Sequence, residues 1–371
     1  MPTATIERIE TFPVSVPFNT DFEVAGGGTE APEHVFVKLH TSQGVGIGEA
    51  APKPFFSPET CGSVLSAVDR LKTALEGIDA TNPTRVQREM AAGIRGNPFA
   101  KTAIEMACYD VWGRTMGVPV SDLLGGRVRD TIRVGQSVGI KAVEAAVADA
   151  ERYVFEEGFD SIKIKIGDPP ADAAARVRAV ADAVGDEASI RVDANQGYTA
   201  DVAVPLFSEL EQDVDLLVVE QPVGREDRGG LASVTAALDT PVLADESVFS
   251  PEDAFSIAAN RRADALNIKL MKAGGLRPAL RIGSVAAAAN YRVAVGSMIE
   301  LGVGTAAGAH LAASLPNLGY PCDTKGPSLF ADTVLRDPLT IDDGRTVVPD
   351  DPGLGVRLDP NKINRYRTDS A

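Results

Sequence analysis

The chain has 371 residues, about twice the length of a typical domain, so we expect two domains or one large barrel with an added layer. Hydrophobic residues make up 44% and charged residues 24%, as in soluble globular proteins, and no apolar run approaches the roughly 20 residues of a membrane helix. The net charge of −16 disfavours nucleic acid and anionic membrane as partners, because both bind basic surfaces. This acidity suits a salt-tolerant organism and an ordinary acidic bacterial enzyme equally well.

The first residues bear on the compartment, and the cysteines bear on disulfides and metal sites. Residues 1–7 lack the basic and apolar regions of a secretory signal, so cytoplasmic residence is the default expectation. The three cysteines, Cys61, Cys108 and Cys322, are far apart and odd in number. This pattern argues against a disulfide framework or a thiolate zinc site and favours buried thiols.

The first ~125 residues open with extended segments and continue with helices. Polar and apolar side chains alternate over 5–16 and 34–41, and glycines punctuate a third extended segment over 44–50, which together predict an antiparallel meander. Apolar residues at helical spacing predict helices over 63–75 and 100–116.

Two glycine-containing segments in this region need an interpretation. Residues 19–32, between the first two strands, form a loop that is either a lid over the site or a disordered connection. The run Gly44-x-Gly46-x-Gly48 lacks the third glycine and the following helix of a dinucleotide-binding fingerprint, so a nucleotide role is disfavoured.

From about residue 130 a unit of strand and helix repeats. The predicted strands are 132–138, 161–166, 189–192, 216–219, 241–243, 265–268 and 292–295. A polar or glycine-bearing loop and an alanine-rich amphipathic helix follow each strand, as over 171–184 and 253–260. Short apolar strands in repeated βα units predict an α/β fold with a parallel sheet, and seven or eight units close into a TIM-like barrel. The alternative, an open doubly wound sheet, would gather its polar residues at one switch point rather than at nearly every strand end.

Acids and lysines recur at the carboxyl-terminal ends of these strands. They are Lys163, Lys165, Asp193, Glu220, Asp245, Lys269 and Glu300. From Lys165 through Asp193, Glu220 and Asp245 to Lys269, successive positions lie 28, 27, 25 and 24 residues apart, the length of one βα unit. Because active sites of barrels assemble at this rim, the side chains are expected to form one ring.

The three consecutive acids of this ring predict a metal site. Asp193, Glu220 and Asp245 would repel one another too strongly to stay ionised without a cation among them. Oxygen ligands of this kind select Mg²⁺ or Mn²⁺ over zinc. Glu246 competes with its neighbour Asp245 for the third position.

The lysines of the ring predict acid–base chemistry. Lys163 and Lys165 are two residues apart, so on a strand both point into the barrel mouth. A lysine must lose about three pKa units to act as a base near neutrality, and a neighbouring cation and a metal both lower its pKa. Lys269, further round the ring, approaches the metal from the opposite side.

Short motifs accompany these residues along nearly the whole chain. They are Gly48-Glu49-Ala50, Lys163-Ile164-Lys165-Ile166-Gly167, Val192-Asp193-Ala194-Asn195, Glu220-Gln221-Pro222, Ala244-Asp245-Glu246-Ser247, Lys269, Gly296-Ser297-Met298-Ile299-Glu300 and Pro352-Gly353-Leu354-Gly355-Val356. Through them the chain resembles the enolase superfamily, specifically its muconate-lactonizing-enzyme subgroup.

The resemblance implies an architecture and a set of roles. It implies a (β/α)7β barrel over 128–325, with an α+β cap formed by residues 1–127 and the tail 326–371. It implies a homo-oligomer, a dimer or an octamer. The implied roles are metal ligation by Asp193, Glu220 and Asp245, acid–base catalysis by Lys165 and Lys269, electrostatic help from Lys163, and substrate binding or support by Asn195, Glu246, Ser297, Glu300, Asp323 and Lys325.

The implied reaction begins at the carbon next to a carboxylate of a small molecule. Removing that proton puts a second negative charge on the group, and a divalent cation on its oxygens offsets the charge. Two lysines on opposite faces allow racemisation or epimerisation, and a ring oxygen converts the same intermediate into lactone opening or closure. With a leaving group the outcome is dehydration, so a lyase for a hydroxy acid or a hydroxyproline-like substrate is the alternative. A non-catalytic, metal-dependent binding protein is the candidate from another class.

The end of the last strand bears on the substrate. Dipeptide epimerases of this subgroup are expected to carry an Asp-x-Asp pair there, whereas this chain has Asp323-Thr324-Lys325 before Gly326-Pro327. A base in place of the second acid argues against recognition of a substrate ammonium group. Lys325 is either a surface lysine or a partner for a second substrate carboxylate, as muconate would present. We therefore predict an isomerase, with cycloisomerisation ahead of racemisation or epimerisation.

Overall fold

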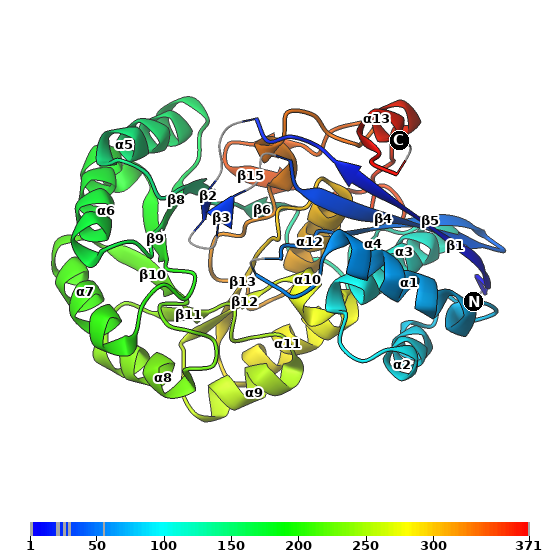
Figure 1. Ribbon diagram of the computed structural model, residues 1–371, viewed down its shortest axis with the longest axis horizontal. Helices are drawn as coiled ribbons and strands as arrows, with labels where there is room; N and C mark the ends of the chain where they lie inside the picture. The colour runs from blue at the N-terminus through cyan, green and yellow to red at the C-terminus, as the bar shows by residue number, and fades with distance from the viewer. Residues whose placement is uncertain (1–2, 20–22, 25–26, 29–30, 55, 370–371) are drawn as a thin grey trace.

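The computed structural model describes residues 3–19, 23–24, 27–28, 31–54 and 56–369. A barrel of parallel strands, covered outside by helices, lies beside a cap built on an antiparallel sheet (Figure 1). The fold is therefore α/β, a TIM-like barrel with an α+β cap, as predicted. No helix in the described part of the chain is long and apolar enough to cross a membrane.

The predicted meander forms the sheet of the cap. Strands β1 (Ile6–Ser15), β4 (Glu33–Thr41) and β5 (Gly44–Ala50) pair antiparallel in that order. The helices of the cap are α1 (Cys61–Leu75), α2 (Pro83–Gly93), α3 (Pro98–Met116) and the short α4 (Val120–Leu123). Helix α4 was not predicted, and neither was the longer α2. Its apolar positions, Val86 and Met90, are too few to give a clear helical period.

The glycines of β5 allow close packing of the sheet on α3. A Cβ atom on Gly46 would lie 2.0 Å from the carbonyl oxygen of Ala107, and one on Gly48 would lie 1.9 Å from that of Ala103. Any larger residue would push the helix away from the sheet. The glycine run therefore serves the packing of β5 on α3, and this is why it does not match the fingerprint of a nucleotide-binding loop.

The barrel contains seven parallel strands and an extended segment that closes it. The strands are β7 (Gln136–Val138), β8 (Ser161–Lys165), β9 (Ser189–Asp193), β10 (Leu216–Glu220), β11 (Val242–Ala244), β12 (Ala265–Ile268) and β13 (Arg292–Val295), paired in chain order. Residues 317–323 lie between β13 and β7. Gly319 N–H donates to the oxygen of Val293 (3.0 Å), and Gly135 N–H donates to that of Cys322 (3.0 Å).

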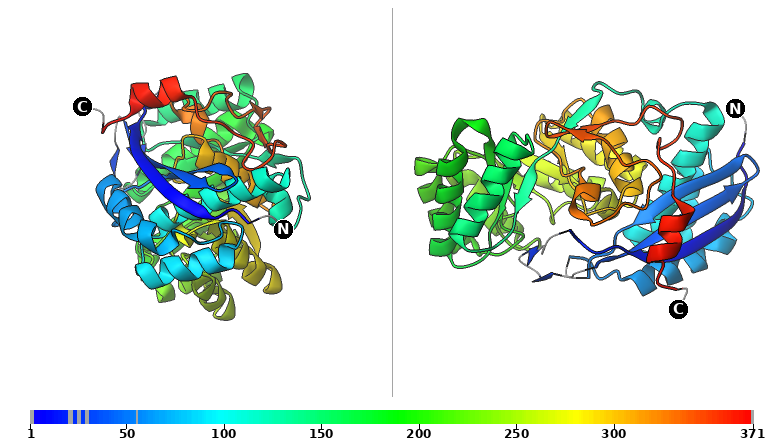
Figure 2. Two further views of the ribbon diagram at one scale, coloured as in Figure 1. Left: turned by 90° about the vertical axis from the view of Figure 1, so that its right-hand side faces the viewer. Right: turned by 90° about the horizontal axis from the view of Figure 1, so that it is seen from above.

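Helices alternate with these strands on the outside of the barrel (Figures 1 and 2). They are α5 (Val143–Glu151) with a π-helical turn at Arg152–Glu156, α6 (Pro170–Val184), α7 (Ala200–Asp213), α8 (Arg228–Ala237), α9 (Pro251–Ala259), α11 (Leu276–Ala288) and α12 (Val303–Ser314). A further short helix, α10 (Leu270–Ala273), follows β12 and packs against α3 of the cap. Side chains from alternate strand positions fill the interior: Val218, Leu243, Ala265 and Ala294 form a separate apolar cluster with Tyr320 packed against it. The polar ring follows toward the carboxyl ends of the strands.

The strand predicted over 132–138 is divided in two. Its first part, β6 (Thr131–Arg133), pairs with β15 (Arg345–Val347) of the tail, and only β7 joins the barrel. The alternating pattern of this segment could not show the division, because the partner of β6 lies more than two hundred residues away.

The tail returns to the cap, as the resemblance implied. After the turn Gly326–Leu329 and strands β14 (Ile341–Asp342) and β15, helix α13 (Pro360–Tyr366) lies beside β1 (Figure 2). Asp110 of α3 accepts hydrogen bonds from Leu354 N–H (2.9 Å) and Ile47 N–H (3.0 Å), which ties the tail to the cap sheet.

The loop and cysteine predictions have separate outcomes. Within 19–32 the strands β2 (Glu23–Val24) and β3 (Gly27–Gly28) form a short hairpin, and most other positions of the predicted lid lie outside the described residues. All three cysteines are free and buried, as predicted.

Candidate active site

The predicted ring assembles at the carboxyl-terminal ends of the barrel strands. Lys165, Asp193 and Glu220 end β8, β9 and β10 and stand level with one another in the parallel register. Asp245 and Lys269 directly follow β11 and β12. Every one of these side chains is buried, with at most 8% of its surface exposed. The alternation of strand residues turns them inward, because their neighbours face the helices.

Lys163 lies one level below the rim and binds two acids. Its Nζ donates to Asp323 Oδ2 (2.5 Å) and Glu220 Oε2 (3.2 Å). Burial alone lowers the pKa of Lys163, but Asp323 and Glu220 outweigh that effect and the pKa is raised. Lys163 is therefore a fixed positive charge below the reacting position.

Lys165 and Lys269 each hold an acid on a different side of the ring. Lys165 Nζ donates to Asp193 Oδ2 (2.6 Å) and to Asn195 Oδ1 (2.7 Å). Lys269 Nζ lies 2.6 Å from Asp245 Oδ2 and 4.7 Å from the centre of the Phe56 ring, which belongs to the cap. Their strands, β8 and β12, are four positions apart in the sheet, so the two amines stand on opposite sides of the barrel.

Carboxylates in this ring have strongly perturbed acidities. Burial raises the pKa of Glu220, and the nearby Asp193 carboxylate raises it further. Burial also raises the pKa of Asp245, but Lys269 and Lys272 reverse the effect and hold it far below its usual range. Glu246, buried beside Asp245, has a pKa raised to about 8. Groups perturbed this strongly in one place are typical of an active site.

Glu246 is bound on one oxygen only by the residues that the structure describes. Asn195 Nδ2 donates to its Oε1 (3.0 Å), while its buried Oε2 has no hydrogen-bond partner among the described residues. Asn195 thus joins Glu246 to Lys165, and the two predicted supporting residues lie together.

The predicted Ser297 and Glu300 bind each other rather than the ring. Ser297 Oγ donates to Glu300 Oε2, and Met298 N–H donates to Glu300 Oε1 (3.1 Å). Between them Ile299 has φ of +63°, an unfavourable conformation for a β-branched residue. His34 of the cap holds it by donating from Nε2 to its oxygen (2.9 Å). The strained turn is thus fixed by the cap.

Lys325 is buried and not a surface lysine. Its Nζ donates to the oxygen of Gly135 and lies 3.4 Å from Ser137 Oγ, on the inner side of β7. Burial lowers the pKa of Lys325 to about 7, against the attraction of Asp323. An amine therefore stands where the Asp-x-Asp pattern would put an acid.

Oxygen donors for a divalent cation are present, although they do not form a complete coordination shell. In the described part of the chain no three His, Cys, Asp or Glu side chains are arranged to hold a metal ion. Oxygens of Asp193, Glu220 and Asp245 are instead bound to Lys165, Lys163 and Lys269. Three buried carboxylates on adjacent strands nevertheless match the preference of Mg²⁺ for hard oxygen ligands. The three carboxylates fit a cation once the lysine amines move away from their oxygens.

Two cationic residues of the ring were not predicted. Arg191, two residues before Asp193 on the same face of β9, donates from Nη1 to the oxygen of Pro321 (2.7 Å) and lies 3.5 Å from Glu220. Lys272 lies 2.5 Å from Asp245 Oδ1. Strand alternation pointed to Arg191, whereas the turn that brings Lys272 back to Asp245 left no sequence signal.

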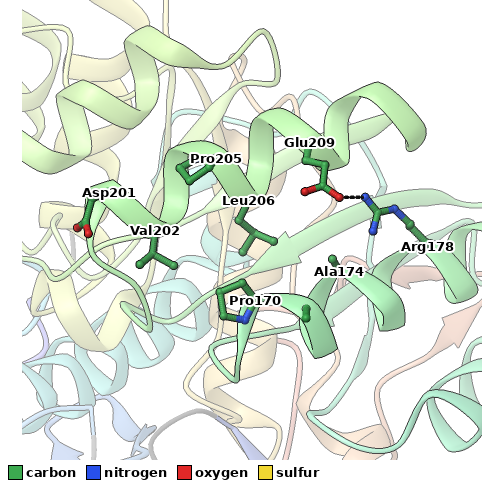
Figure 3. Close-up of a pocket in the computed structure, with 9 residues that line it drawn as sticks. Pro170, Ala174, Arg178, Asp201, Val202, Pro205, Leu206 and Glu209 are labelled. Carbon is green, nitrogen blue, oxygen red and sulfur yellow. Dashed lines mark hydrogen bonds and ion pairs between the residues drawn. The ribbon is translucent and has the colours of Figure 1, made fainter.

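A hollow of about 530 Å³ on the outside of the barrel is not part of this site. It lies between α6 and α7 and is lined by Pro170, Val202, Leu206 and the ion pair Arg178–Glu209 (2.7 Å), as Figure 3 shows. None of the ring residues borders it.

A barrel with buried acids and amines at its carboxyl-terminal rim is typical of an enzyme that transfers protons. The model of the mandelate racemase/muconate lactonizing enzyme N-terminal domain matches residues 8–125, and that of the enolase C-terminal-like domain matches residues 145–362. The chain therefore belongs to the mandelate racemase/muconate lactonizing enzyme family of the enolase superfamily.

Characterised relatives cover almost the entire chain. The L-Ala-D/L-Glu epimerase of Bacillus subtilis is 38% identical over 95% of this chain and 96% of its own length. The structure of Pseudomonas fluorescens muconate lactonizing enzyme with muconolactone is 33% identical, with a TM-score of 0.96 over 99% of this chain and 100% of that one. A dipeptide epimerase of Enterococcus faecalis, solved with Mg and L-Leu-L-Tyr, is 31% identical, with a TM-score of 0.91 over 95% of this chain and 99% of that one.

These relatives confirm the predicted class of reaction. They are isomerases of one superfamily, and the chain is an isomerase of the same kind. The predicted alternative of a dehydratase is not favoured. Dependence on a divalent metal is a property of the family to which both domain models belong.

Proposed function

We propose that the protein is a magnesium-dependent isomerase with muconate-type cycloisomerisation of a dicarboxylic acid as its reaction: one carboxylate closes the lactone ring, and a proton is added to the carbon next to the other carboxylate, or removed from it when the ring opens. The observation that carries this proposal is Lys325, a buried amine at the end of the last barrel strand. A second substrate carboxylate is the natural partner of such a group.

Asp193, Glu220 and Asp245 are the residues that would hold the cation. Bound there, Mg²⁺ would neutralise charge that develops on the substrate carboxylate. Mn²⁺ offers the same chemistry and is an alternative occupant. The Mg complex of the dipeptide epimerase supports magnesium as the first choice.

The lysines would carry the proton. Lys165 and Lys269 stand on opposite sides of the ring, so one removes or returns a proton on one face of the substrate carbon and the other acts on the opposite face. Lys163, fixed by Asp323 and Glu220, would stabilise negative charge without moving a proton.

The charge of the ring favours a substrate with two carboxylates. Among the described residues, the basic side chains of the ring are Lys163, Lys165, Arg191, Lys269, Lys272 and Lys325, and the acidic ones are Asp193, Glu220, Asp245, Glu246 and Asp323. Basic groups outnumber acidic ones by one, and a divalent cation would add two positive charges. The excess is then three positive charges, of which a dianion offsets two and a dipeptide without net charge offsets none.

Racemisation or epimerisation of an amino-acid derivative is the second candidate. It is favoured by the opposed Lys165 and Lys269 and by the 38% identity to the Bacillus subtilis epimerase. An N-acylated amino acid with a distal carboxylate would also satisfy Lys325.

Incubation in deuterium oxide with Mg²⁺ tests the proposal. Candidates are muconates, N-acylated amino acids, proline derivatives and dipeptides, followed by mass spectrometry and NMR. We expect muconate to form a lactone and dicarboxylates to exchange the α-proton. Exchange with dipeptides alone would favour the epimerase, and no exchange with any acid would favour a binding protein.

Three further features stay predictions. They are the homo-oligomeric state as a dimer or an octamer, cytoplasmic residence, and domain boundaries at residues 127 and 325. Size-exclusion chromatography with light scattering measures the first, and limited proteolysis tests the boundaries.

A further inference from the structure

Lys272 is the most completely bound amine of the ring. Its Nζ donates to the backbone oxygen of Asp245, to Asp245 Oδ1 (2.5 Å) and to the backbone oxygen of Asn267 (3.0 Å). An ammonium group has three N–H donors, so these contacts use all of them. The residue is also buried, and because all three donors are used within the barrel, none is left for a substrate.

Lys269 and Lys272 hold opposite oxygens of one carboxylate. Both come from the segment that begins at the end of β12, and α10 turns the chain so that two side chains three residues apart converge on Asp245. Lys269 approaches Oδ2 and Lys272 approaches Oδ1, at 2.6 and 2.5 Å. Lys269 also borders the cap through Phe56, whereas the hydrogen bonds of Lys272 go to Asp245 and Asn267 of the barrel.

Lys272 also reaches a second proposed ligand through one intermediate residue. Asn267 accepts from Lys272 through its backbone oxygen, and its Nδ2 donates to Glu220 Oε1 (2.6 Å). One buried ammonium group thus ties together acids of β10 and β11 and the end of β12. Groups that orient ligands from behind commonly set metal affinity.

We propose that Lys272 is a positioning residue for the divalent cation: it fixes Asp245 Oδ1 and, through Asn267, the orientation of Glu220, so that both carboxylates stay in place to hold the cation. Lys269 is then free to leave Oδ2 and serve in proton transfer. This inference rests on the proposed metal site and goes beyond it, because Lys272 contacts neither the substrate position nor the ion.

The test compares Mn²⁺ binding by isothermal titration calorimetry in the full-length wild type, Lys272→Met and Lys141→Met. Lys141 is a matched control, because its Nζ also lies 2.5 Å from an aspartate, Asp149, but on the outside of the barrel. We expect Lys272→Met to weaken Mn²⁺ binding about tenfold or more at 25 °C, as is usual for residues behind a ligand. Lys141→Met should keep the wild-type affinity.

Lys272→Arg keeps the positive charge but cannot place three donors on the same three oxygens. It should lose at least about fivefold in affinity, and it decides the question if Lys272→Met does not fold. Wild-type or tighter Mn²⁺ binding in folded Lys272→Met or Lys272→Arg would overturn the inference. It would mean that Lys272 contributes only its positive charge or its packing, and not the placement of its three donors. A wild type that fails to bind Mn²⁺ would instead refute the proposed metal site itself.

Discussion

Lys165 and Lys269 stand on opposite sides of the barrel, each 2.6 Å from a different acid, Asp193 and Asp245. Both amines are nearly buried, and both approach the ring from strand ends that lie four positions apart in the sheet. A substrate carbon between them would meet one amine on each face.

The first prediction concerns these amines. Lys269→Ala should lower turnover by about a thousandfold or more while sparing metal binding, because general acid–base groups contribute roughly 10² to 10⁴ in rate. Lys165→Ala should do the same for the overall reaction. Steady-state kinetics and Mn²⁺ titration measure the two effects, with Lys141→Ala as control. Undiminished activity in Lys269→Ala would refute its assigned role.

The second prediction separates the acids. Asp193→Asn should abolish Mn²⁺ binding, because it removes a charged oxygen ligand from a buried site. Glu246→Gln should retain affinity within about threefold, since Asn195 binds one oxygen of Glu246 and a glutamine can accept the same hydrogen bond. Calorimetry on both variants, with EDTA-treated wild type as reference, gives the answer. If Glu246→Gln loses Mn²⁺ binding and Asp193→Asn keeps it, Glu246 rather than Asp193 is a ligand of the cation.

The third prediction concerns Lys325. Lys325→Met is nearly isosteric but uncharged, so kcat/KM for a dicarboxylate should fall about tenfold or more, mainly through KM. A monocarboxylate analogue that lacks the distal group should lose far less. Equal losses for both substrates would mean that Lys325 supports the barrel wall through Gly135 rather than binding substrate.

The fourth prediction concerns acid stability. His310 accepts a hydrogen bond from Ser121 N–H at Nδ1 (3.3 Å) and donates from Nε2 to the oxygen of Leu354 (3.2 Å), so only the neutral ring fits. Burial lowers the pKa of His310 to about 4, from an ordinary value of 6.5. As the pH falls below 6.5, the unfolded chain therefore binds a proton at this histidine before the folded chain does. The free energy of unfolding is highest above pH 6.5 and falls by about 3 kcal/mol as the pH approaches 4.

Urea unfolding between pH 4 and 7.5 measures this slope. His310→Gln keeps one acceptor and one donor but cannot be protonated, so its free energy of unfolding should vary less over that window. His40→Gln is the control, since His40 is a partly exposed histidine at the edge of the cap. A slope unchanged in His310→Gln would contradict the prediction.

The fifth prediction concerns the joint between cap and barrel. Glu49 of β5 accepts hydrogen bonds from Leu301 N–H (2.6 Å), Gly302 N–H (3.3 Å) and Gly304 N–H (2.9 Å), at the start of α12. Glu49→Ala leaves these buried donors unpaired and should cost about 2–3 kcal/mol in the free energy of unfolding. Urea titration against the exposed control Glu7→Ala measures it, and a difference below about 0.5 kcal/mol would show that water replaces the carboxylate.

Much of this architecture could be predicted because its signals are local. Strand alternation placed Lys163 and Lys165 on one face, and the even spacing of βα units brought Asp193, Glu220 and Asp245 to one rim. The structure confirms the barrel and the level register of these strand ends. The short helix α2 was missed, since only a few of its residues are apolar and buried.

Other features were decided only by tertiary structure. The sequence by itself determined which strands run parallel and that the acids and lysines at their ends meet at one rim, because both follow from a period of two along a strand and a repeated unit length. It did not determine that 132–138 divides between two sheets, that Glu49 holds the start of α12, or that Lys272 closes behind Asp245. Each depends on contacts between segments far apart in the chain, whose relative placement is fixed only when the core packs.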